Sequence, residues 1–234
     1  TDALQVRMGG TLYLVIAHTG GYTYTSDASS FTDDTTDTKF LSFWNDKLWG
    51  ISNTGQLWYA SSIGTEVNDA KLPLPDGHVT DLFVARNASG DPVIYAMTKE
   101  GLYAHDFSNN KFVETQLALP FHNQNGKGST RWRDSVYIPA GLGIYKYING
   151  SNSAVVTIVG PDRDDGMGTH NDLLAMMDGT LAPGTVDMFA TGESSVINGS
   201  TGYSSILGYN ESGWEVKWAA SGNDQGKKIT AGFV

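Results

Sequence analysis

The sequence predicts an all-β fold assembled from repeated units of short antiparallel strands. One motif recurs with equal spacing: Trp44-Asn45-Asp46-Lys47-Leu48-Trp49, Gly55 and Tyr59 reappear as Trp132-Arg133-Asp134-Ser135-Val136-Tyr137, Gly143 and Tyr147. Gly is abundant at 28 of 234 residues, as many tight turns require, whereas charged residues make up only 17%. No stretch of the chain has the periodicity of an amphipathic helix.

The repeat has a period of roughly 40 residues, which is the length of one four-stranded antiparallel unit. Repeated units of this kind indicate a β-propeller, whose blades pack face to face around a central channel. We expect one domain over residues 1–234, with five blades at about 1–32, 33–75, 76–120, 121–160 and 161–222. The alternative is that the chain forms part of a six- or seven-bladed propeller.

The strands of the units can be placed in order along the chain. The first unit is expected to open in its second strand, Leu12–Ala17, and the chain to end in a closing strand, Lys227–Val234, that joins the first blade. The third unit is the clearest, because turns rich in Gly, Asn, Asp and Ser separate four predicted strands: Val79–Arg86, Val93–Thr98, Leu102–Asp106 and Lys111–Leu117.

The fifth unit is irregular. Ser205–Tyr209 and Gly213–Trp218 match the third and fourth strands of the repeat. Leu173–Met177 and Val186–Ala190 are candidates for the first two strands. The stretch Gly179–Gly202 is predicted to be a long loop or an extra hairpin.

Two columns of residues recur within the units. A two-residue hairpin turn needs positive φ, which predicts turn positions for Gly20, Gly55, Gly101 and Gly143. A second column is expected to fill the space between neighbouring blades: Tyr24, Tyr59, His105, Tyr147 and Tyr209. Asp46 and Asp134 are expected to close the turns that follow Trp44 and Trp132 by accepting backbone N–H groups.

The charge balance argues against two classes of partner. The net charge is −10, the pI is about 4.7 and the 15 basic residues are scattered. Nucleic acid and anionic membrane surfaces need clustered Lys and Arg, so we expect neither as a partner. The absence of Cys excludes disulfides, thiolate metal sites and a Cys nucleophile. Because the chain begins at Thr1 without Met, a processed product or part of a longer chain is expected.

Motifs of catalysis are missing from the sequence. Neither a Gly-x-Ser-x-Gly nucleophile turn nor a His-Glu-x-x-His zinc helix occurs. His105 belongs to the aromatic column and is interpreted as a packing residue. We therefore predict no enzymatic activity, and the alternative is a glycosidase or lyase whose carboxylates gather at a channel mouth from several blades.

Two segments are candidates for binding. Asp162, Asp164 and Asp165 precede Gly166 in an acidic turn, and hard cations such as Ca²⁺ prefer several oxygens from such a turn. The alternative is a solvated turn without metal. The polar loop Phe121–Arg131 leads into a tryptophan, which predicts a sugar- or peptide-binding group of His122, Asn123, Asn125, Arg131 and Trp132. The alternative is an ordinary connection between blades.

The segment Val136–Tyr147, with Gly160–Gly166 after it, resembles the propeller repeats of phage and environmental-virus proteins that are tail or other virion components. It is also similar to the sensor propellers of bacterial two-component regulators, whose repeats read roughly Trp-Ile-Gly-Thr-x-x-Gly-Leu-x-x-Tyr. The resemblance covers about Leu12–Trp218.

The virus-type resemblance implies a non-enzymatic structural or receptor-facing protein of a virion or cell surface. Its implied partners are other protein subunits of an assembly or a host-surface glycan. The second resemblance leaves open a ligand-sensing domain of a bacterial exported protein. Neither resemblance carries catalytic residues or a cofactor over to this chain.

The calcium hypothesis can be tested by thermal unfolding. If Asp162, Asp164 and Asp165 hold Ca²⁺, a chelator lowers Tm and added Ca²⁺ restores it, because a ligand bound only to the native state stabilises that state. A Tm that is the same with and without the chelator excludes the site.

Overall fold

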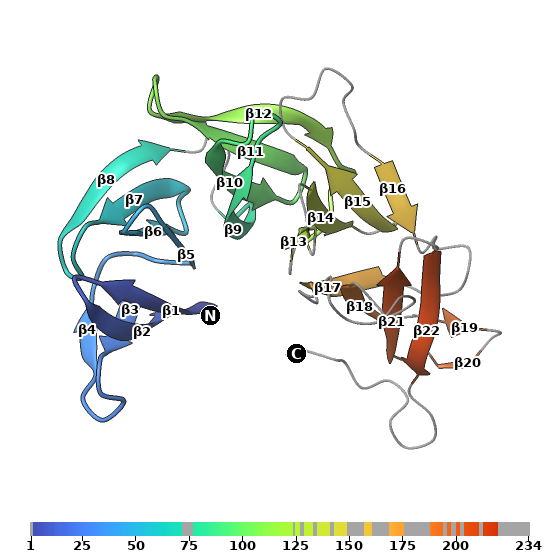
Figure 1. The fold of residues 1–234 in the computed structure, drawn as a ribbon, viewed down its shortest axis with the longest axis horizontal. Coiled ribbons are helices and arrows are strands. Elements are labelled where there is room, and N and C mark those ends of the chain that lie inside the picture. Colours follow the sequence, from blue (N-terminus) through green and yellow to red (C-terminus); the bar gives the residue numbers. More distant parts are fainter. Residues whose placement is uncertain are drawn as a thin grey trace. The chain divides into compact units, whose positions relative to one another are not determined.

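The computed structural model contains five four-stranded sheets and one two-stranded hairpin among its described residues (Figure 1). It describes residues 2–71, 77–123, 125–126, 129–132, 135–140, 143–148, 157–160, 169–175, 188–193, 196–197, 200–201, 204–210 and 213–219. Every helix or strand assigned within these ranges is a β-strand, which confirms the all-β class. In this part of the chain no helix is long and apolar enough to cross a membrane.

The first three sheets each contain four strands that follow one another in the sequence. Sheet 1 is formed by β1 (Asp2–Met8), β2 (Thr11–His18), β3 (Gly21–Thr25) and β4 (Thr32–Asp34). Sheet 2 is formed by β5 (Phe40–Trp44), β6 (Lys47–Ile51), β7 (Gln56–Ala60) and β8 (Glu66–Lys71). Sheet 3 is formed by β9 (Val79–Arg86), β10 (Pro92–Thr98), β11 (Gly101–Asp106) and β12 (Lys111–Ala118).

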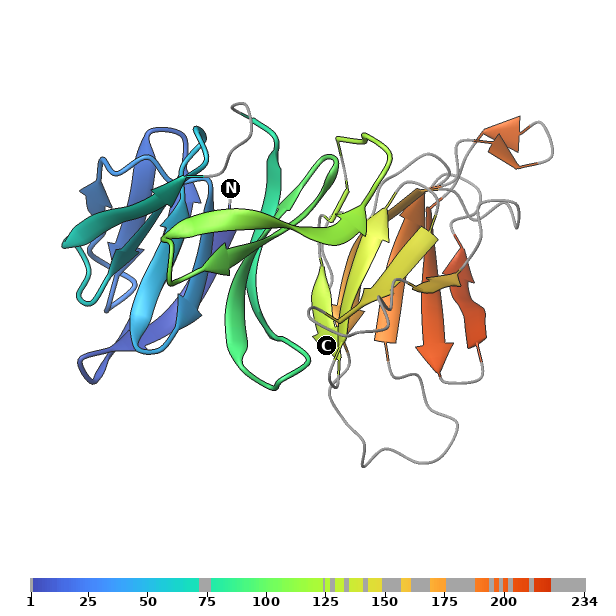
Figure 2. The ribbon, with the colours of Figure 1, turned by 90° about the horizontal axis from the view of Figure 1, so that it is seen from above.

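Sheet 4 follows the same order, with β13 (Thr130–Trp132), β14 (Ser135–Ala140), β15 (Gly143–Tyr147) and β16 (Thr157–Gly160). In sheet 5 the strands are not all consecutive in the sequence. The sheet contains β17 (Thr169–Ala175), β18 (Met188–Glu193), β21 (Ser204–Asn210) and β22 (Gly213–Ala219). A hairpin of β19 (Val196–Ile197) and β20 (Ser200–Thr201) lies between β18 and β21 in the chain (Figure 2). Of the two structures predicted within Gly179–Gly202, a long loop or an extra hairpin, the hairpin is therefore present.

The strands predicted for the third unit agree with β9–β12 to within one residue at each end. The first unit differs from expectation, because β1 (Asp2–Met8) precedes the strand that was expected to open the fold. Its signal is the alternation of Leu4, Val6 and Met8 with more exposed residues. Sheet 1 therefore has four strands among the described residues. The predicted closing strand Lys227–Val234 lies outside the described residues and stays a prediction.

The chain falls into two compact units. One unit contains residues 1–85 and 92–115, and the other contains residues 86–91 and 116–234. The first holds sheets 1 and 2 with most of sheet 3. In the second, β17 lies against β13 and β14.

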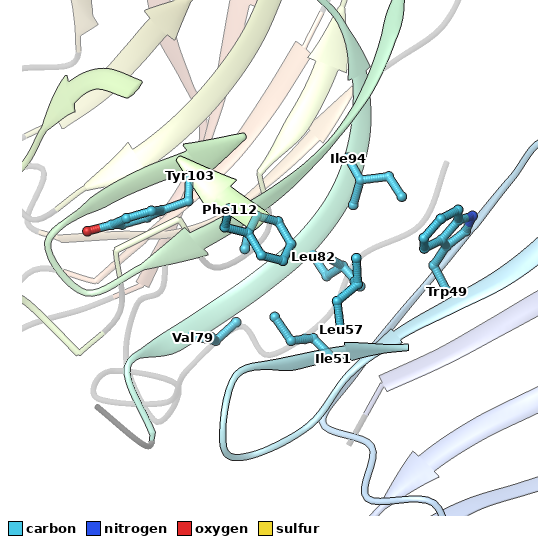
Figure 3. Close-up of a cluster of buried hydrophobic side chains, with 9 residues drawn as sticks. Trp49, Ile51, Leu57, Val79, Leu82, Ile94, Tyr103 and Phe112 are labelled. Carbon is cyan, nitrogen blue, oxygen red and sulfur yellow. The ribbon is translucent and has the colours of Figure 1, made fainter. Parts of the chain in front are cut away.

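Sheet 2 buries apolar side chains on both of its faces. Leu48 of β6 belongs to a buried cluster shared with sheet 1, together with Val6, Met8, Val15, Ala17, Tyr22, Leu41, Trp58 and Ala60. Trp49, the next residue, belongs to a second cluster shared with sheet 3, together with Ile51, Leu57, Val79, Leu82, Ile94, Ala96, Tyr103 and Phe112 (Figure 3). Because successive strand residues point to opposite faces, this double burial explains the continuous apolar run of β6.

An aromatic stack connects sheets 1 and 2. The ring of Tyr22 lies on the indole of Trp58, with centroids 5.6 Å apart and an interplanar angle of 21°. The Tyr22 hydroxyl donates a hydrogen bond to Glu66 and accepts one from the Gly64 N–H at 3.2 Å. Burial, followed by the hydrogen bond to Glu66, raises the pKa of Tyr22, so the hydroxyl keeps its proton.

Gly50 makes room for this stack. It pairs with Trp58 across β6 and β7. A Cβ added at Gly50 would lie 2.2 Å from the indole carbons of Trp58, which is far inside contact distance. The indole therefore lies over the bare backbone of β6, and a larger residue at position 50 would displace it.

The aromatic column is confirmed in two sheets and shifted in the third. Tyr24 packs against the cluster between sheets 1 and 2, and Tyr59 against the cluster between sheets 2 and 3, so each faces the following sheet. His105 instead contacts Trp49 of the preceding sheet, with centroids 6.5 Å apart. It is buried, as expected of a packing residue.

The glycine column accounts for this shift. Gly20 and Gly55 stand in turns with φ of 97° and 76°, as predicted. Gly101 is instead the first residue of β11 and lacks a positive φ. In each unit the ring lies four residues after the glycine. Because Gly101 is already part of its strand, His105 lies one strand position further along than Tyr24 and Tyr59 do. A shift of one position turns a side chain to the opposite face of the sheet.

The turn after Trp44 is built differently from the prediction. Asn45 and Asp46 have φ of 53° and 54°, so both adopt the left-handed conformation of a two-residue type I′ hairpin turn. Asp46 thus occupies a turn position that Asn, Asp and Gly tolerate best. Asp134, its counterpart in the second copy of the motif, lies outside the described residues.

The Gly50–Trp58 contact predicts a large effect of one methyl group. Gly50→Ala should destabilise the native state by about 1–3 kcal/mol, the usual cost of overpacking a well-packed site. Chemical denaturation measures this free energy. In a Trp58→Leu background the same substitution should cost much less, since the indole that it displaces is absent. Equal costs in the two backgrounds would contradict the proposed contact.

Candidate functional site

The predicted binding loop is folded by its own hydrogen bonds. Asn125 is fully buried, and its side-chain amide donates to the Pro120 carbonyl at 2.7 Å. The Asn125 backbone N–H donates to the His122 carbonyl at 3.2 Å. The Asn125 side chain therefore stabilises the conformation of the loop. Asn123, by contrast, is exposed, and His122 is half-buried.

The other predicted site residues are described only in part or not at all. Arg131 and Trp132 lie in β13, where they pair with Val136 and Ser135, and only their backbone is described. Asp162, Asp164 and Asp165 lie outside the described residues. Within the described part of the chain, no group of three His, Asp or Glu residues is gathered in a way that could hold a metal ion. The ligand and calcium hypotheses for these residues stay predictions.

A pocket that the sequence did not reveal lies in the first unit. It has a volume of about 390 Å³, within the range of small-molecule sites. Its lining comes from the end of β2, the connection into β5 and the turn between β6 and β7: Ala17, His18, Thr19, Thr38, Lys39 and Asn53. These three segments adjoin the same end of sheets 1 and 2. In sheet 1, Ala17 pairs with Asp2 near the start of β1. In sheet 2, Lys39 donates its N–H to the Ile51 carbonyl at the end of β6, at 2.8 Å.

Asp2 joins the two sheets beside this pocket. Its Oδ2 accepts a hydrogen bond from the Leu41 N–H in β5 at 2.8 Å. Burial raises the pKa of the Asp2 carboxyl, and the hydrogen bonds from Leu41 and Ala3 oppose that rise. This hydrogen bond holds β1 against β5. Since β2 pairs with β1, it also holds the pocket walls that adjoin β2 and β5.

His18 is held in a chain of hydrogen bonds. Thr23 donates its hydroxyl proton to the Asp33 carboxylate, so its oxygen accepts from His18 Nε2 at 2.9 Å. His18 Nδ1 lies 3.1 Å from the Thr19 carbonyl, which can only accept. The ring of His18 is therefore held between the Thr23 hydroxyl and the Thr19 carbonyl, which fixes its position in the pocket lining.

Lys39 also belongs to the pocket lining, and its ammonium group is bound to sheet 3. Its Nζ donates to the Val79 carbonyl and lies 5.2 Å from the centroid of the Phe40 ring. Burial lowers the pKa of the Lys39 ammonium, and the positive charge of Lys99 lowers it further.

The polar residues on the remaining wall are fixed by the backbone. Asn53 donates its backbone N–H and its side-chain amide to the Asp37 carboxylate, at 3.1 and 2.6 Å. Thr38 is buried and donates its hydroxyl to the Thr36 carbonyl at 2.7 Å. The wall is therefore rigid, and its side-chain oxygens at Thr38 and Asn53 retain acceptor capacity.

The sequence carried only a weak signal for this pocket. His18 and Lys39 are 21 positions apart in the chain, and neither belongs to a motif. What brings them together is the packing of sheet 1 on sheet 2, which a search for local motifs does not detect. The available clue was that both residues adjoin a strand end, where loops held by a rigid sheet often carry function.

Comparisons with known proteins were informative only at the level of structure. No protein-family model matches the sequence, and the search of curated proteins finds no match. The computationally designed protein Ika8 aligns with a TM-score of 0.57 at 11% identity, over 96% of this chain and 62% of its own. The extracellular domain of the putative hybrid two component system BT4673 from B. thetaiotaomicron aligns with a TM-score of 0.57 at 15% identity.

The BT4673 alignment covers 97% of this chain and 28% of that chain. A chain of the Mitotic Checkpoint Complex aligns with a TM-score of 0.52 at 12% identity, over 94% of this chain and 67% of its own. Likeness at such identities concerns the fold alone. Since the BT4673 domain has a propeller-like fold, the four-stranded sheets of this chain are propeller-like blades.

The environment of Lys39 predicts its reactivity. The pH midpoint for acylation of its amine should fall below 10.5, the ordinary lysine value, because burial and Lys99 disfavour the ammonium form. Peptide mass spectrometry over a pH series measures that midpoint. Lys99→Gln should move it upward by removing the like charge. A midpoint at or above the ordinary value would contradict this account of the site.

Proposed function

We propose that this chain is a non-enzymatic binding propeller whose blades hold a ligand site at one end of sheets 1 and 2. The observation that carries the proposal is the pocket of about 390 Å³, whose lining includes His18, Lys39 and the polar residues Thr38 and Asn53 held by hydrogen bonds. Rigid sheets position the three segments that line it, which is how binding loops are commonly supported. Five blades, alone or as part of a larger propeller, form the proposed architecture.

The hydrogen bonds of the pocket favour holding a ligand over transforming it. Both ring nitrogens of His18 are already engaged by protein groups, the Thr23 hydroxyl at 2.9 Å and the Thr19 carbonyl at 3.1 Å. A ring held in this way on both sides contributes shape to a site, and this arrangement supports a binding role.

A virion tail or surface protein is the first biological setting that we propose. The resemblance of Val136–Tyr147 to virus propeller repeats supports it, and the partners would be other protein subunits of the assembly or a host-surface glycan. A ligand-sensing domain of a bacterial exported protein is the second setting. The fold shared with the extracellular domain of BT4673 and the small-molecule size of the pocket favour it.

A binding screen of the intact chain tests the proposal. Thermal shift and calorimetry against a panel of host-surface glycans and small metabolites should identify a ligand that raises Tm. Substituting His18 and Lys39 together (His18→Ala with Lys39→Gln) should weaken that ligand by about tenfold or more. Lys111→Gln removes an exposed charge from β12, outside the pocket lining, and should leave the affinity unchanged.

Two results would overturn the proposal. Conversion of the bound ligand into a product, detected by mass spectrometry, would show that the chain is an enzyme. An affinity that is unchanged in the His18 and Lys39 variant would place the binding site elsewhere on the molecule.

A further inference from the structure

We infer that a second binding site lies where sheets 2 and 3 meet, and that it holds a neutral sugar ring against the side chains of Trp44 and Phe107. The inference goes beyond the proposed function, because neither residue lines the pocket. Three observations carry it: an exposed ring that the protein holds in place, exposed polar residues on the turn beside it, and an apolar area of small size.

Phe107 is exposed and yet held by other rings. It follows β11, and 47% of its surface is accessible to solvent. Its ring centroid lies 5.6 Å from that of Trp44, 6.2 Å from that of Trp49 and 4.3 Å from that of His105. Trp49 is buried at the edge of the cluster between sheets 2 and 3 (Figure 3). An exposed ring with such fixed neighbours is preorganised for a ligand, since binding orders little that was mobile before.

Trp44 adds a second ring to this surface. It is half-buried at the end of β5, and its carbonyl accepts a hydrogen bond from the Trp49 indole N–H at 3.1 Å. The face of an aromatic ring carries partial negative charge, and the C–H bonds on the face of a pyranose carry partial positive charge. A sugar ring can therefore stack on Trp44 and Phe107 through its C–H face.

A hairpin turn brings polar groups to the edge of the two rings. Asn45 and Asp46 follow Trp44 directly, and both are exposed. Their φ values of 53° and 54° belong to the two-residue turn that joins β5 to β6, so their backbone is fixed by the hairpin. An amide donates and accepts hydrogen bonds and a carboxylate accepts them, which suits the hydroxyls at the rim of a sugar ring.

The apolar area of the site is small. A stable protein–protein interface buries about 800 Å² on each partner. An aromatic side chain buries about 150–250 Å² when it is fully covered. Because Phe107 is 47% exposed and Trp44 is half-buried, the two rings together present far less area than a protein partner needs. This area suits one face of a single sugar ring.

The charges next to the rings favour a neutral sugar over an acidic one. Asp46 stands two residues after Trp44, in a chain whose net charge is −10. The next residue, Lys47, has its ammonium group 4.2 Å from the centroid of the Tyr59 ring, so this cation is engaged with an aromatic ring of the protein itself. The carboxylate of an acidic sugar would be repelled by Asp46, whereas hydroxyl groups can donate to it.

The test uses the intact chain and matched probes. Methyl β-D-glucopyranoside and methyl β-D-galactopyranoside are neutral rings, glucuronate adds a negative charge, and sorbitol keeps the hydroxyls but has no ring. At least one neutral ring should shift the backbone amide signals of Asn45, Asp46 and Ser108 in a saturable NMR titration. Glucuronate and sorbitol should each bind at least about tenfold more weakly.

Two variants separate the ring contact from the polar contact. Phe107→Ala should weaken the neutral sugar by about tenfold or more, whereas Phe107→Tyr, which keeps a ring, should retain most of the affinity. Replacing Asn45 and Asp46 together with Gly preserves the turn, because Gly adopts positive φ readily, and should weaken the sugar by about threefold or more. The matched control is Phe31→Ala, which removes a phenylalanine that is 54% exposed just before β4 and should change nothing.

Four results would overturn the inference. These are the absence of shifts at Asn45, Asp46 and Ser108 with both neutral rings, sorbitol or glucuronate binding as tightly as the neutral sugar, and an unchanged affinity of the Phe107→Ala variant. The fourth is loss of the shifts in the variant that combines His18→Ala with Lys39→Gln, since the shifts would then originate in the pocket. Failure of the sugar site leaves the proposed function intact, because the pocket is tested through its own lining residues.

Discussion

The first unit depends on one constraint, which is that sheet 2 must be apolar on both faces at once. Leu48 and Trp58 face sheet 1, while Trp49 and Leu57 face sheet 3. A sheet with two buried faces is stable only between two neighbours, so burial itself dictates that the sheets follow one another in a stack. Within the cluster that joins sheet 1 to sheet 2, Tyr22 stacks on Trp58, and Gly50 leaves the space for the indole.

The pocket is a consequence of that stacking. Sheets 1 and 2 pack through their apolar faces, so the segments that leave their common end are brought together whatever residues they carry. His18, Lys39 and Asn53 have no role in the two clusters that hold the sheets together. The core therefore fixes the position of the site, and the connecting segments fix its chemistry. A site of this kind can change its ligand without changing the fold.

The all-β class and the four-stranded antiparallel units were predictable from the sequence because their signals are local. Strand and turn composition located β9–β12, and the spacing of the Trp motif gave the repeat. β1 was missed, since the period-two pattern of Leu4, Val6 and Met8 is short and lacks the motif. The site was beyond local reasoning, because His18 and Lys39 meet only through the packing of two sheets. The Phe121–Arg131 loop attracted attention by its polar composition, yet the Asn125 side chain there donates to the Pro120 carbonyl and stabilises the loop itself.

The shift of His105 has an evolutionary consequence. Tyr24 and Tyr59 are each the fourth residue of their strand, and His105 is the fifth, so a difference of one position decides which neighbouring sheet a ring meets. Duplicated units can therefore exchange their packing partners through a single insertion or deletion beside a turn, with every aromatic residue retained. In sheet 3 the count from turn to ring differs by one, and the sheet still has the four-stranded order of sheets 1 and 2. The spacing between turn and ring thus decides which neighbour a ring meets, whereas the strand order does not depend on it.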